Sequence, residues 1–273
     1  MLIDAHQHFW RIGRNAHSWP TPDLTAIHRD FGPEDWTAVA APLGFTGSVL
    51  VQSQPSDRDT DWLLDVAAVT ETVKAVVGWT DLLAPDASER IALLARRPKL
   101  RGLRPMLQNL PADDWIVQPA LAPAIEAMLA RGLSLDALVF TRHLPHLRIF
   151  AQRWPQLPIV IDHAAKPPIA VGELDPWREE IAACAALPNV VCKLSGLLTE
   201  AAPEQGSETL ATYVAHLIAA FGPERLMWGS DWPVLKLAGD FAGWFATADS
   251  LADLRGPERA RLFGGTAASF YRI

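Results

Sequence analysis

Short apolar segments recur along the whole chain, and segments with helical spacing separate many of them. Eight candidate strands lie at residues 2–8, 47–53, 75–82, 101–106, 133–139, 158–163, 190–195 and 226–231. Several of them are almost continuously apolar, which is typical of strands that are covered on both faces. The pattern therefore predicts a sheet of buried strands.

Helical patterns occupy many of the gaps between these strands. Candidate helices lie at residues 58–73, 85–97, 119–131, 208–221 and 257–263. Pro85 with the acidic residues after it is a typical helix start, and Gly132 is a typical helix end. Alternation of strand and helix predicts a parallel sheet. Eight strand–helix units in 273 residues match an α/β fold of the (β/α)8 TIM barrel type, as a single domain over residues 1–273.

Two further features refine this prediction. A doubly wound open sheet is the alternative, but the first predicted strand leads into HFWRIGRN and carries no glycine-rich phosphate loop. Residues 11–37 are long and irregular, with Pro20, Pro22 and Pro33. Long loops of this kind are often functional, so we expect this one to lie over the barrel mouth.

Composition narrows the classes of function. The chain is 49% apolar and 20% charged, which fits a globular protein with a substantial core. Its net charge is −7 and it has no basic stripe, so we expect no nucleic-acid partner. No apolar run approaches the roughly 20 residues of a membrane span, so we expect no membrane partner, and we expect no secretion signal. Cys184 and Cys192 form no CxxC pair, so we expect reduced thiols and a cytoplasmic protein, and no feature specifies an oligomeric state.

Polar residues occur near the end of the first predicted strand. His6 and His8 are two residues apart, so their side chains should point to the same face, with Asp4 on that face as well. In a barrel of this type the active site lies at the C-terminal ends of the strands. We therefore expect both histidines at the barrel mouth.

Proline marks the ends of three further predicted strands. Because proline donates no backbone hydrogen bond, it tends to end a central strand. It follows shortly after Arg104, His163 and Asp231. These three residues should therefore share one rim of the barrel with the two histidines of the first strand.

Three imidazoles and a carboxylate on one rim support two kinds of chemistry. His6, His8, His163 and Asp231 suit a single zinc-like ion that keeps room for water or substrate. They also suit hydrolysis without a metal, in which Asp231 takes a proton from water while the imidazoles hydrogen-bond a substrate carbonyl. Each residue alone has a structural alternative, such as a histidine satisfied in the core or an aspartate that caps a helix. Their convergence favours a site.

Several other polar residues near strand ends are candidate substrate contacts: Arg104, Lys166, Gln52, Lys193 and Asp136. Lys193 lies inside an apolar strand, where a buried lysine needs a partner. It is either a substrate contact or one half of an inward structural ion pair. Lys166 is either a substrate contact or a solvated loop residue.

These residues carry a resemblance to the amidohydrolase superfamily, and within it to the branch of sugar-acid lactonases. The similar stretches are DAHQHFW (4–10), VVGWTDL (76–82), LRGLRPMLQ (100–108), DALVFTRHLP (136–145), DHAAKP (162–167), VVCKLSGLLTEA (190–201), FGPERLMWGSDWPV (221–234) and GGTAASFY (264–271). They cover nearly the whole chain in the order found in that branch. A departure is Ala165, where the branch commonly has glycine.

The resemblance implies a lactonase barrel with named roles. Asp231 would activate water, and His6, His8 and His163 would polarise the lactone carbonyl. Arg104 and Lys166 would contact the oxygen atoms of the substrate. Members of this branch can work without metal, so we expect either no cofactor or one weakly bound Zn²⁺. Two-metal members carry a bridging carbamylated lysine near the end of the fourth or fifth strand, and this chain has none there, so a dinuclear site is not expected.

The predicted function is hydrolysis of a sugar-acid lactone of the L-fucono-, L-rhamnono- or L-galactono-lactone type to its hydroxy acid. Two alternatives remain open from the sequence. One is a zinc-dependent amidohydrolase or decarboxylase of the same superfamily, which would need tightly bound metal. The other is a non-catalytic protein that binds sugar acids.

Overall fold

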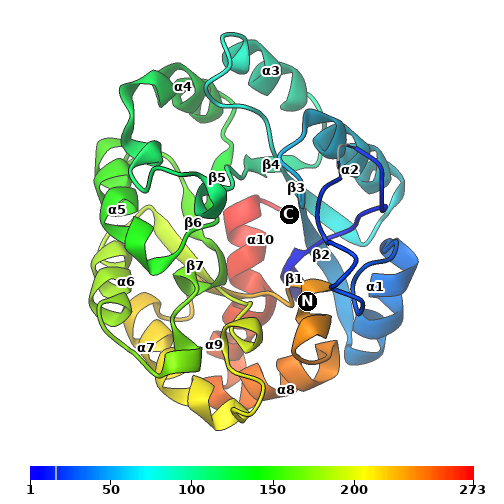
Figure 1. Ribbon diagram of the computed structural model, residues 1–273, viewed down its shortest axis with the longest axis vertical. Helices are drawn as coiled ribbons and strands as arrows, with labels where there is room; N and C mark the ends of the chain where they lie inside the picture. The colour runs from blue at the N-terminus through cyan, green and yellow to red at the C-terminus, as the bar shows by residue number, and fades with distance from the viewer. Residues whose placement is uncertain (16) are drawn as a thin grey trace.

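Eight parallel strands follow one another in chain order around the middle of the molecule in a computed structural model, which describes residues 1–15 and 17–273 (Figure 1). They are β1 (Leu2–Gln7), β2 (Phe45–Val51), β3 (Val73–Gly78), β4 (Leu100–Leu103), β5 (Ser134–Ala137), β6 (Ile159–Ile161), β7 (Val190–Leu194) and β8 (Leu226–Trp228). Beyond β8, the N–H of Asp231 donates to His6 O and the N–H of His8 donates to Trp232 O, both at 2.8 Å. These bonds join the end of the sheet to its beginning, and the predicted single-domain (β/α)8 barrel is confirmed.

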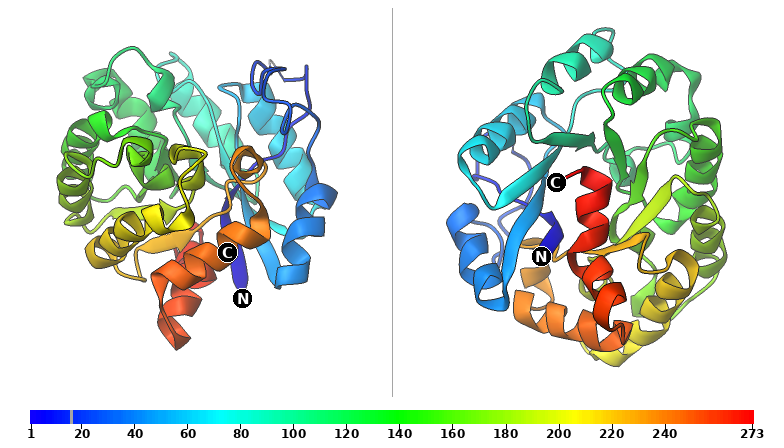
Figure 2. Two further views of the ribbon diagram at one scale, coloured as in Figure 1. Left: turned by 60° about the horizontal axis from the view of Figure 1, so that its bottom comes forward. Right: turned by 180° about the vertical axis from the view of Figure 1, so that it is seen from behind.

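Most of the helices surround the strands (Figure 1). They are α1 (Pro33–Ala40), α2 (Asp57–Val69), α3 (Ala87–Leu94), α4 (Ala122–Ala130), α5 (Leu144–Arg153), α6 (Trp177–Ala185), α7 (Ala211–Phe221), α8 (Phe241–Ala252), α9 (Gly256–Ala260) and α10 (Thr266–Tyr271). The last of them, α10, lies across the end of the barrel where the strands begin, as the view from behind shows (Figure 2). Within the described part of the chain, every helix is too short or too polar to cross a membrane.

The five predicted helices correspond to α2, α3, α4, α7 and α9, whereas α1, α5, α6, α8 and α10 were not predicted. The sequence of α8 shows the physical reason. It contains Gly243 and Thr247, which are weak helix formers. Its buried residues Phe241, Trp244 and Ala248 pack in the core, and tertiary packing of this kind supplies most of the stability of a helix in a protein.

The irregular stretch predicted at residues 11–37 is shorter than expected. Residues 33–37 belong to α1, which begins at Pro33, and residue 16 lies outside the described residues. Proline is well tolerated in the first turn of a helix, because the N–H that it lacks would have no partner in the helix. The Asp35 carboxylate also accepts the N–H of Gly32 at 3.0 Å, which secures the helix start. Pro33 therefore marks a helix and not a loop.

The apolar core has two layers. The inner layer fills the barrel with small and branched side chains from the strands, including Ile3, Val49 and Val77, and Ala267 and Tyr271 of α10 join it. The outer layer lies between the strands and the surrounding helices. Because α10 fills the end of the barrel where the strands begin, the opposite end, where the strands finish, is the one that can hold a site.

Candidate active site

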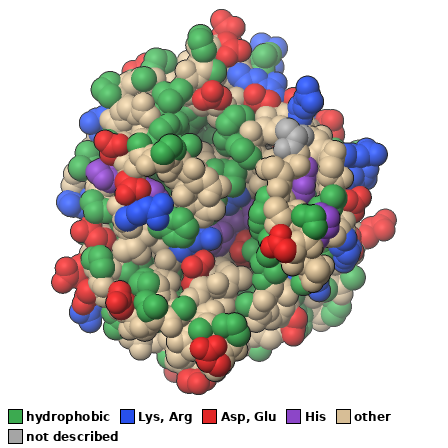
Figure 3. Space-filling view, viewed as in Figure 1, with side chains coloured by type: hydrophobic (Ala, Val, Ile, Leu, Met, Phe, Trp, Pro, Cys, Tyr) green, Lys and Arg blue, Asp and Glu red, His purple; other side chains and the backbone are tan. Residues whose placement is uncertain are grey.

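A cavity of about 340 Å³ opens where the strands end. Figure 3 shows this face, with a hollow near its middle that contains histidine and basic side chains. Five of the predicted site residues line the cavity: His8, Arg104, His163, Lys166 and Asp231. They are joined by residues that were not predicted: Ser18, Trp19, Ser53, Gln54, Pro55, Met106, Gln108, Asn109, Leu138 and Val234.

A bulge in β1 determines which of its side chains face the site. The pairing of β1 with β2 shifts between Asp4 and Gln7, which breaks the alternation of side chains. His6 and His8 point to the same side, with their Nε2 atoms 3.1 Å apart. Asp4 instead accepts a hydrogen bond from Nε1 of Trp36 in α1 at 3.0 Å. The prediction that Asp4 shares the histidine face is therefore wrong.

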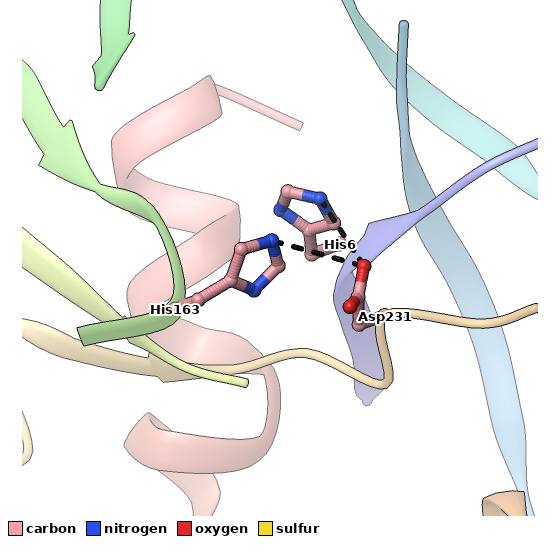
Figure 4. Close-up of side chains that lie close together, drawn as sticks. All are labelled: His6, His163 and Asp231. Atoms are coloured by element: carbon pink, nitrogen blue, oxygen red, sulfur yellow. Dashed lines mark ion pairs between the residues drawn. The ribbon is translucent and has the colours of Figure 1, made fainter. Parts of the chain in front are cut away.

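The three imidazoles meet around Asp231, and Figure 4 shows two of them with this carboxylate. From Asp231 Oδ1, the distances to Nε2 are 3.3 Å for His8, 3.7 Å for His163 and 3.8 Å for His6. The ligand atoms of His6, His163 and Asp231 all lie within 4.8 Å of one another. Two imidazole nitrogens and a carboxylate oxygen are ligands that zinc accepts, so these residues fit a single zinc ion.

Two of these residues have a strained backbone conformation. His163 and Asp231 have φ angles of 52° and 56°, in the left-handed region, and residues 164–166 also have positive φ. Non-glycine residues in this conformation cost about 1–3 kcal/mol each and are frequent at functional sites. Arg104, by contrast, follows β4 directly without such a turn.

Hydrogen bonds from the far side of each ring orient the imidazoles. His8 Nδ1 lies 2.8 Å from Val51 O. Because a carbonyl oxygen only accepts, this nitrogen carries hydrogen, and Nε2 is directed toward Asp231. His163 Nδ1 lies 2.8 Å from Ser195 Oγ, which holds this ring from the end of β7. Such partners are what a ring needs to keep its geometry as a ligand or a catalyst.

Burial and mutual contact decide the charges of the cluster. Burial lowers the pKa of His163 to about 4 and lowers the pKa of His6 well below its ordinary value. Burial alone would raise the pKa of Asp231, but the facing imidazoles outweigh it and keep that pKa below its usual range. Near neutral pH the cluster therefore combines an ionised carboxylate with neutral rings of His6 and His163, and it can accept a proton.

Three of the predicted substrate contacts lie beneath the cavity and do not line it. Lys193 is completely buried, with Nζ 2.7 Å from Asp136 Oδ2, so it forms the inward ion pair that the sequence left as an alternative. Gln52 donates from Nε2 to Arg104 O at 3.0 Å. Gln52, Asp136 and Lys193 are all fully buried, in the layer below the mouth. The structure thus places them as supports of the site and not in its wall.

Asp162 is the main supporting residue that sequence reasoning missed. Its carboxylate lies 3.1 Å from Arg104 Nη1 and 2.9 Å from Lys193 Nζ, and all three side chains are buried. A signal was available, because Asp162 follows an apolar run directly and precedes His163. A charged residue in such a position requires a partner.

Gln54 was missed as well, although it ties the mouth loop to the barrel. Its Nε2 donates to Trp19 O at 2.6 Å, and its Oε1 accepts from Ser18 N at 3.1 Å. Both of these loop residues line the cavity. The polar run that begins at Gln52 was the signal, since it continues past the predicted end of that strand.

Lys166 lies at the rim of the cavity. Its Nζ is 3.4 Å from Oε1 of Glu200, a half-buried residue that was not predicted. The ammonium group also lies over the ring of Phe140, 5.6 Å from its centroid. Lys166 is therefore held by partners and presents a positive charge beside the cavity.

Comparison with known proteins agrees with this geometry. The family model described as amidohydrolase matches residues 3–273. An L-fucono-1,5-lactonase of Burkholderia ambifaria is 54% identical, with 99% of this chain and 95% of that protein covered. An L-fucono-1,5-lactonase of Burkholderia multivorans is 37% identical, with 100% and 96% covered. A solved amidohydrolase from B. multivorans with bound zinc is 36% identical, covers 100% of this chain and 99% of its own, and has a TM-score of 0.93. The chain belongs to the amidohydrolase family.

Proposed function

We propose that the chain hydrolyses a sugar-acid lactone to its open hydroxy acid, with L-fucono-1,5-lactone as the first candidate substrate. The observation that carries the proposal is the 54% identity, over 99% of the chain, with a protein named L-fucono-1,5-lactonase. The related L-rhamnono-lactone differs from it in the arrangement of its hydroxyl groups, and L-galactono-lactone carries an additional hydroxyl group on C6. We propose that side chains in the wall of the cavity, including Trp19 and Gln108, contact these hydroxyl groups and distinguish one lactone from another.

In the proposed reaction Asp231 accepts a proton from water, and the water oxygen attacks the carbonyl carbon of the lactone. The bond between that carbon and the ring oxygen then breaks, and the ring oxygen becomes a hydroxyl by taking up the proton that Asp231 accepted, which leaves Asp231 ionised again. The imidazole cluster stabilises the negative charge that develops on the carbonyl oxygen. Arg104 and Lys166, which line the cavity, offer hydrogen-bond donors to substrate oxygens.

A metal ion is optional in this proposal. His6, His163 and Asp231 would hold one zinc ion. Bound zinc would act as a Lewis acid that polarises the carbonyl. We propose none or one weakly bound ion and not two, because neither β4 nor β5 carries the lysine that bridges two metals in other members of the superfamily.

Replacement of the proposed base tests the reaction. Asp231→Asn keeps the shape of the side chain but cannot take the proton, so kcat should fall by a factor of about 10² to 10⁴ while the sugar acid still binds. The control is Asp86→Asn, an exposed residue before α3, which should keep the full rate. An Asp231→Asn variant with unchanged kcat would remove Asp231 from its role.

The substrate class is tested by a pH-indicator assay over a set of sugar lactones, with and without a chelator. We expect turnover of at least one of the L-sugar lactones that survives chelation. Activity that is lost with the chelator and restored by zinc would instead favour the zinc-dependent alternative. Binding of sugar acids without turnover of any lactone would favour the non-catalytic protein.

A further inference from the structure

A chain of buried polar contacts connects the C-terminal helix with the catalytic cluster. Tyr271, at the end of α10, donates from its hydroxyl to Asp136 Oδ2 at 2.6 Å. The same oxygen accepts from Lys193 Nζ at 2.7 Å, and Lys193 Nζ reaches His6 Nδ1 at 3.2 Å. All four side chains are completely buried. The contacts thus run through the barrel from its closed end to a residue beside Asp231.

The position of this chain of contacts limits how it can act. Tyr271, Asp136 and Lys193 do not line the cavity, so a bound substrate would not touch them. Figure 2 shows α10 at the end of the barrel opposite the mouth. Any influence of these three residues on the reaction must therefore pass through His6.

Two charged groups meet Nδ1 of His6. Lys193 Nζ lies 3.2 Å from this nitrogen, and Asp162 Oδ1 lies 3.4 Å from it. The other ring nitrogen, Nε2, is 3.1 Å from Nε2 of His8 and 3.5 Å from Nη1 of Arg104. Lys193 therefore helps to fix the orientation of the His6 ring beside the other site residues.

Two carboxylates hold the Lys193 ammonium in the position from which it does this. Asp136 Oδ2 lies at 2.7 Å and Asp162 Oδ1 at 2.9 Å. Asp136 is itself fixed by the Tyr271 hydroxyl, with Ser134 Oγ 3.3 Å from its other oxygen. In a buried network each bond affects its neighbours, so loss of the tyrosine hydroxyl changes how Asp136 holds Lys193.

We infer that Tyr271 is a positioning residue of the active site, which acts through Asp136 and Lys193 on His6. The C-terminal helix is then part of the catalytic apparatus as well as a plug for the barrel. The inference goes beyond the proposed lactone hydrolysis and rests on it only for a kinetic test.

The kinetic test uses the two tyrosines of the chain as a matched pair. Tyr271→Phe removes the hydroxyl that meets Asp136, and Tyr213→Phe removes one that donates to Glu173 O at 3.1 Å on the outside of the barrel. With the proposed substrate, Tyr271→Phe should lower kcat about tenfold or more and leave KM unchanged. Tyr213→Phe should alter neither. A folded Tyr271→Phe enzyme with full kcat, or with a change in KM alone, would overturn the inference.

A second measurement needs no lactone. In the chain labelled with 3-fluorotyrosine, fluorine NMR gives one signal for each tyrosine, and the two phenylalanine variants assign them. His6→Asn changes the far end of the chain of contacts, so it should shift the Tyr271 signal and leave that of Tyr213 in place. A Tyr271 signal that does not move would refute the coupling. If no lactone is hydrolysed, the proposed function fails, and this measurement still decides the inference.

Discussion

Asp59 is a carboxyl group that the fold keeps almost completely from water, although it lies in the first turn of α2. Burial raises its pKa from 3.8 to about 6, against the opposing effect of the backbone N–H groups of Ser53 and Gln54. The folded chain thus binds this proton more tightly than the unfolded chain does. Asp59 therefore contributes stability that is complete below about pH 4 and is lost as the pH rises through 6.

Replacement of Asp59 by Asn isolates this contribution. The free energy of unfolding of the unmodified chain, minus that of the variant, should be roughly 1 kcal/mol larger at pH 5 than at pH 7. Urea unfolding at the two pH values measures it. Asp65→Asn, at an exposed position of the same helix, reports the effect of removing one carboxylate. A difference that grows with pH would contradict burial as the cause of the raised pKa.

Single residues of the site could be predicted where the sequence marks the end of a strand. Proline placed His163 and Asp231 at one rim, and in the structure they meet His6 of β1 and His8 just after it. The same rule could not separate the wall of the cavity from the layer below it. Lys193 and Asp136 lie in strands that end at this rim, yet both side chains point into the interior and neutralise each other. Which layer a polar residue occupies depends on bulges and on partners distant in the sequence.

Gly196 is an example of how an element positions a side chain of the candidate active site. It follows β7 with a φ angle of 67°, and a Cβ at this position would lie 2.7 Å from Nδ1 of His163. The turn at the end of β7 therefore leaves the space that the imidazole occupies. The imidazole of His163 cannot easily move away from such a Cβ, because the His163 backbone lies in a strained turn and Ser195 Oγ contacts the ring.

Gly196→Ala should displace the imidazole of His163 and lower kcat by about 10², since a misplacement of about 1 Å can have an effect of this size. The matched control is Gly172→Ala. Gly172 has a similar φ of 71°, but a Cβ there would meet nothing within 4 Å. Both variants carry the backbone strain, and only Gly196→Ala carries the clash. Equal kcat values for the two variants, measured on the same lactone, would show that the clash has no catalytic effect.

At the same scale, the strands were more predictable than the helices. All eight strands fall within or beside the predicted segments, because parallel strands covered on both faces must be apolar along their length. Helices such as α8 depend on packing of one face, and their sequences contain residues that are weak helix formers. The strand–helix count was enough to predict the barrel, and the missed helices did not alter it.

At the scale of the whole molecule, the two ends of the chain close the barrel together. The segment Arg261–Gly265 and α10 pack against β1 and β8, so the last residues of the chain support the first strand. The strand count of the sequence predicted a barrel, but no pattern in the sequence predicted that the final helix would fill the end of the barrel where the strands begin. That arrangement depends on contacts between the two ends of the chain, which no local pattern records.

Gly264 lies at the contact between the two ends, and its replacement tests how much their fit stabilises the fold. A Cβ at this position would clash with the carbonyl oxygen of Met1 and lie 3.1 Å from Ile3 N, both of them backbone atoms that cannot rotate away. Gly264→Ala should therefore lower the free energy of unfolding by about 1–3 kcal/mol, as overpacking does in a protein core. Gly243→Ala, at an exposed position of α8 where a Cβ makes ordinary contacts, should instead raise it by up to about 1 kcal/mol. Urea unfolding of both variants gives the two signs, and a Gly264→Ala variant as stable as the unmodified chain would mean that β1 can move away from the C-terminal segment without cost.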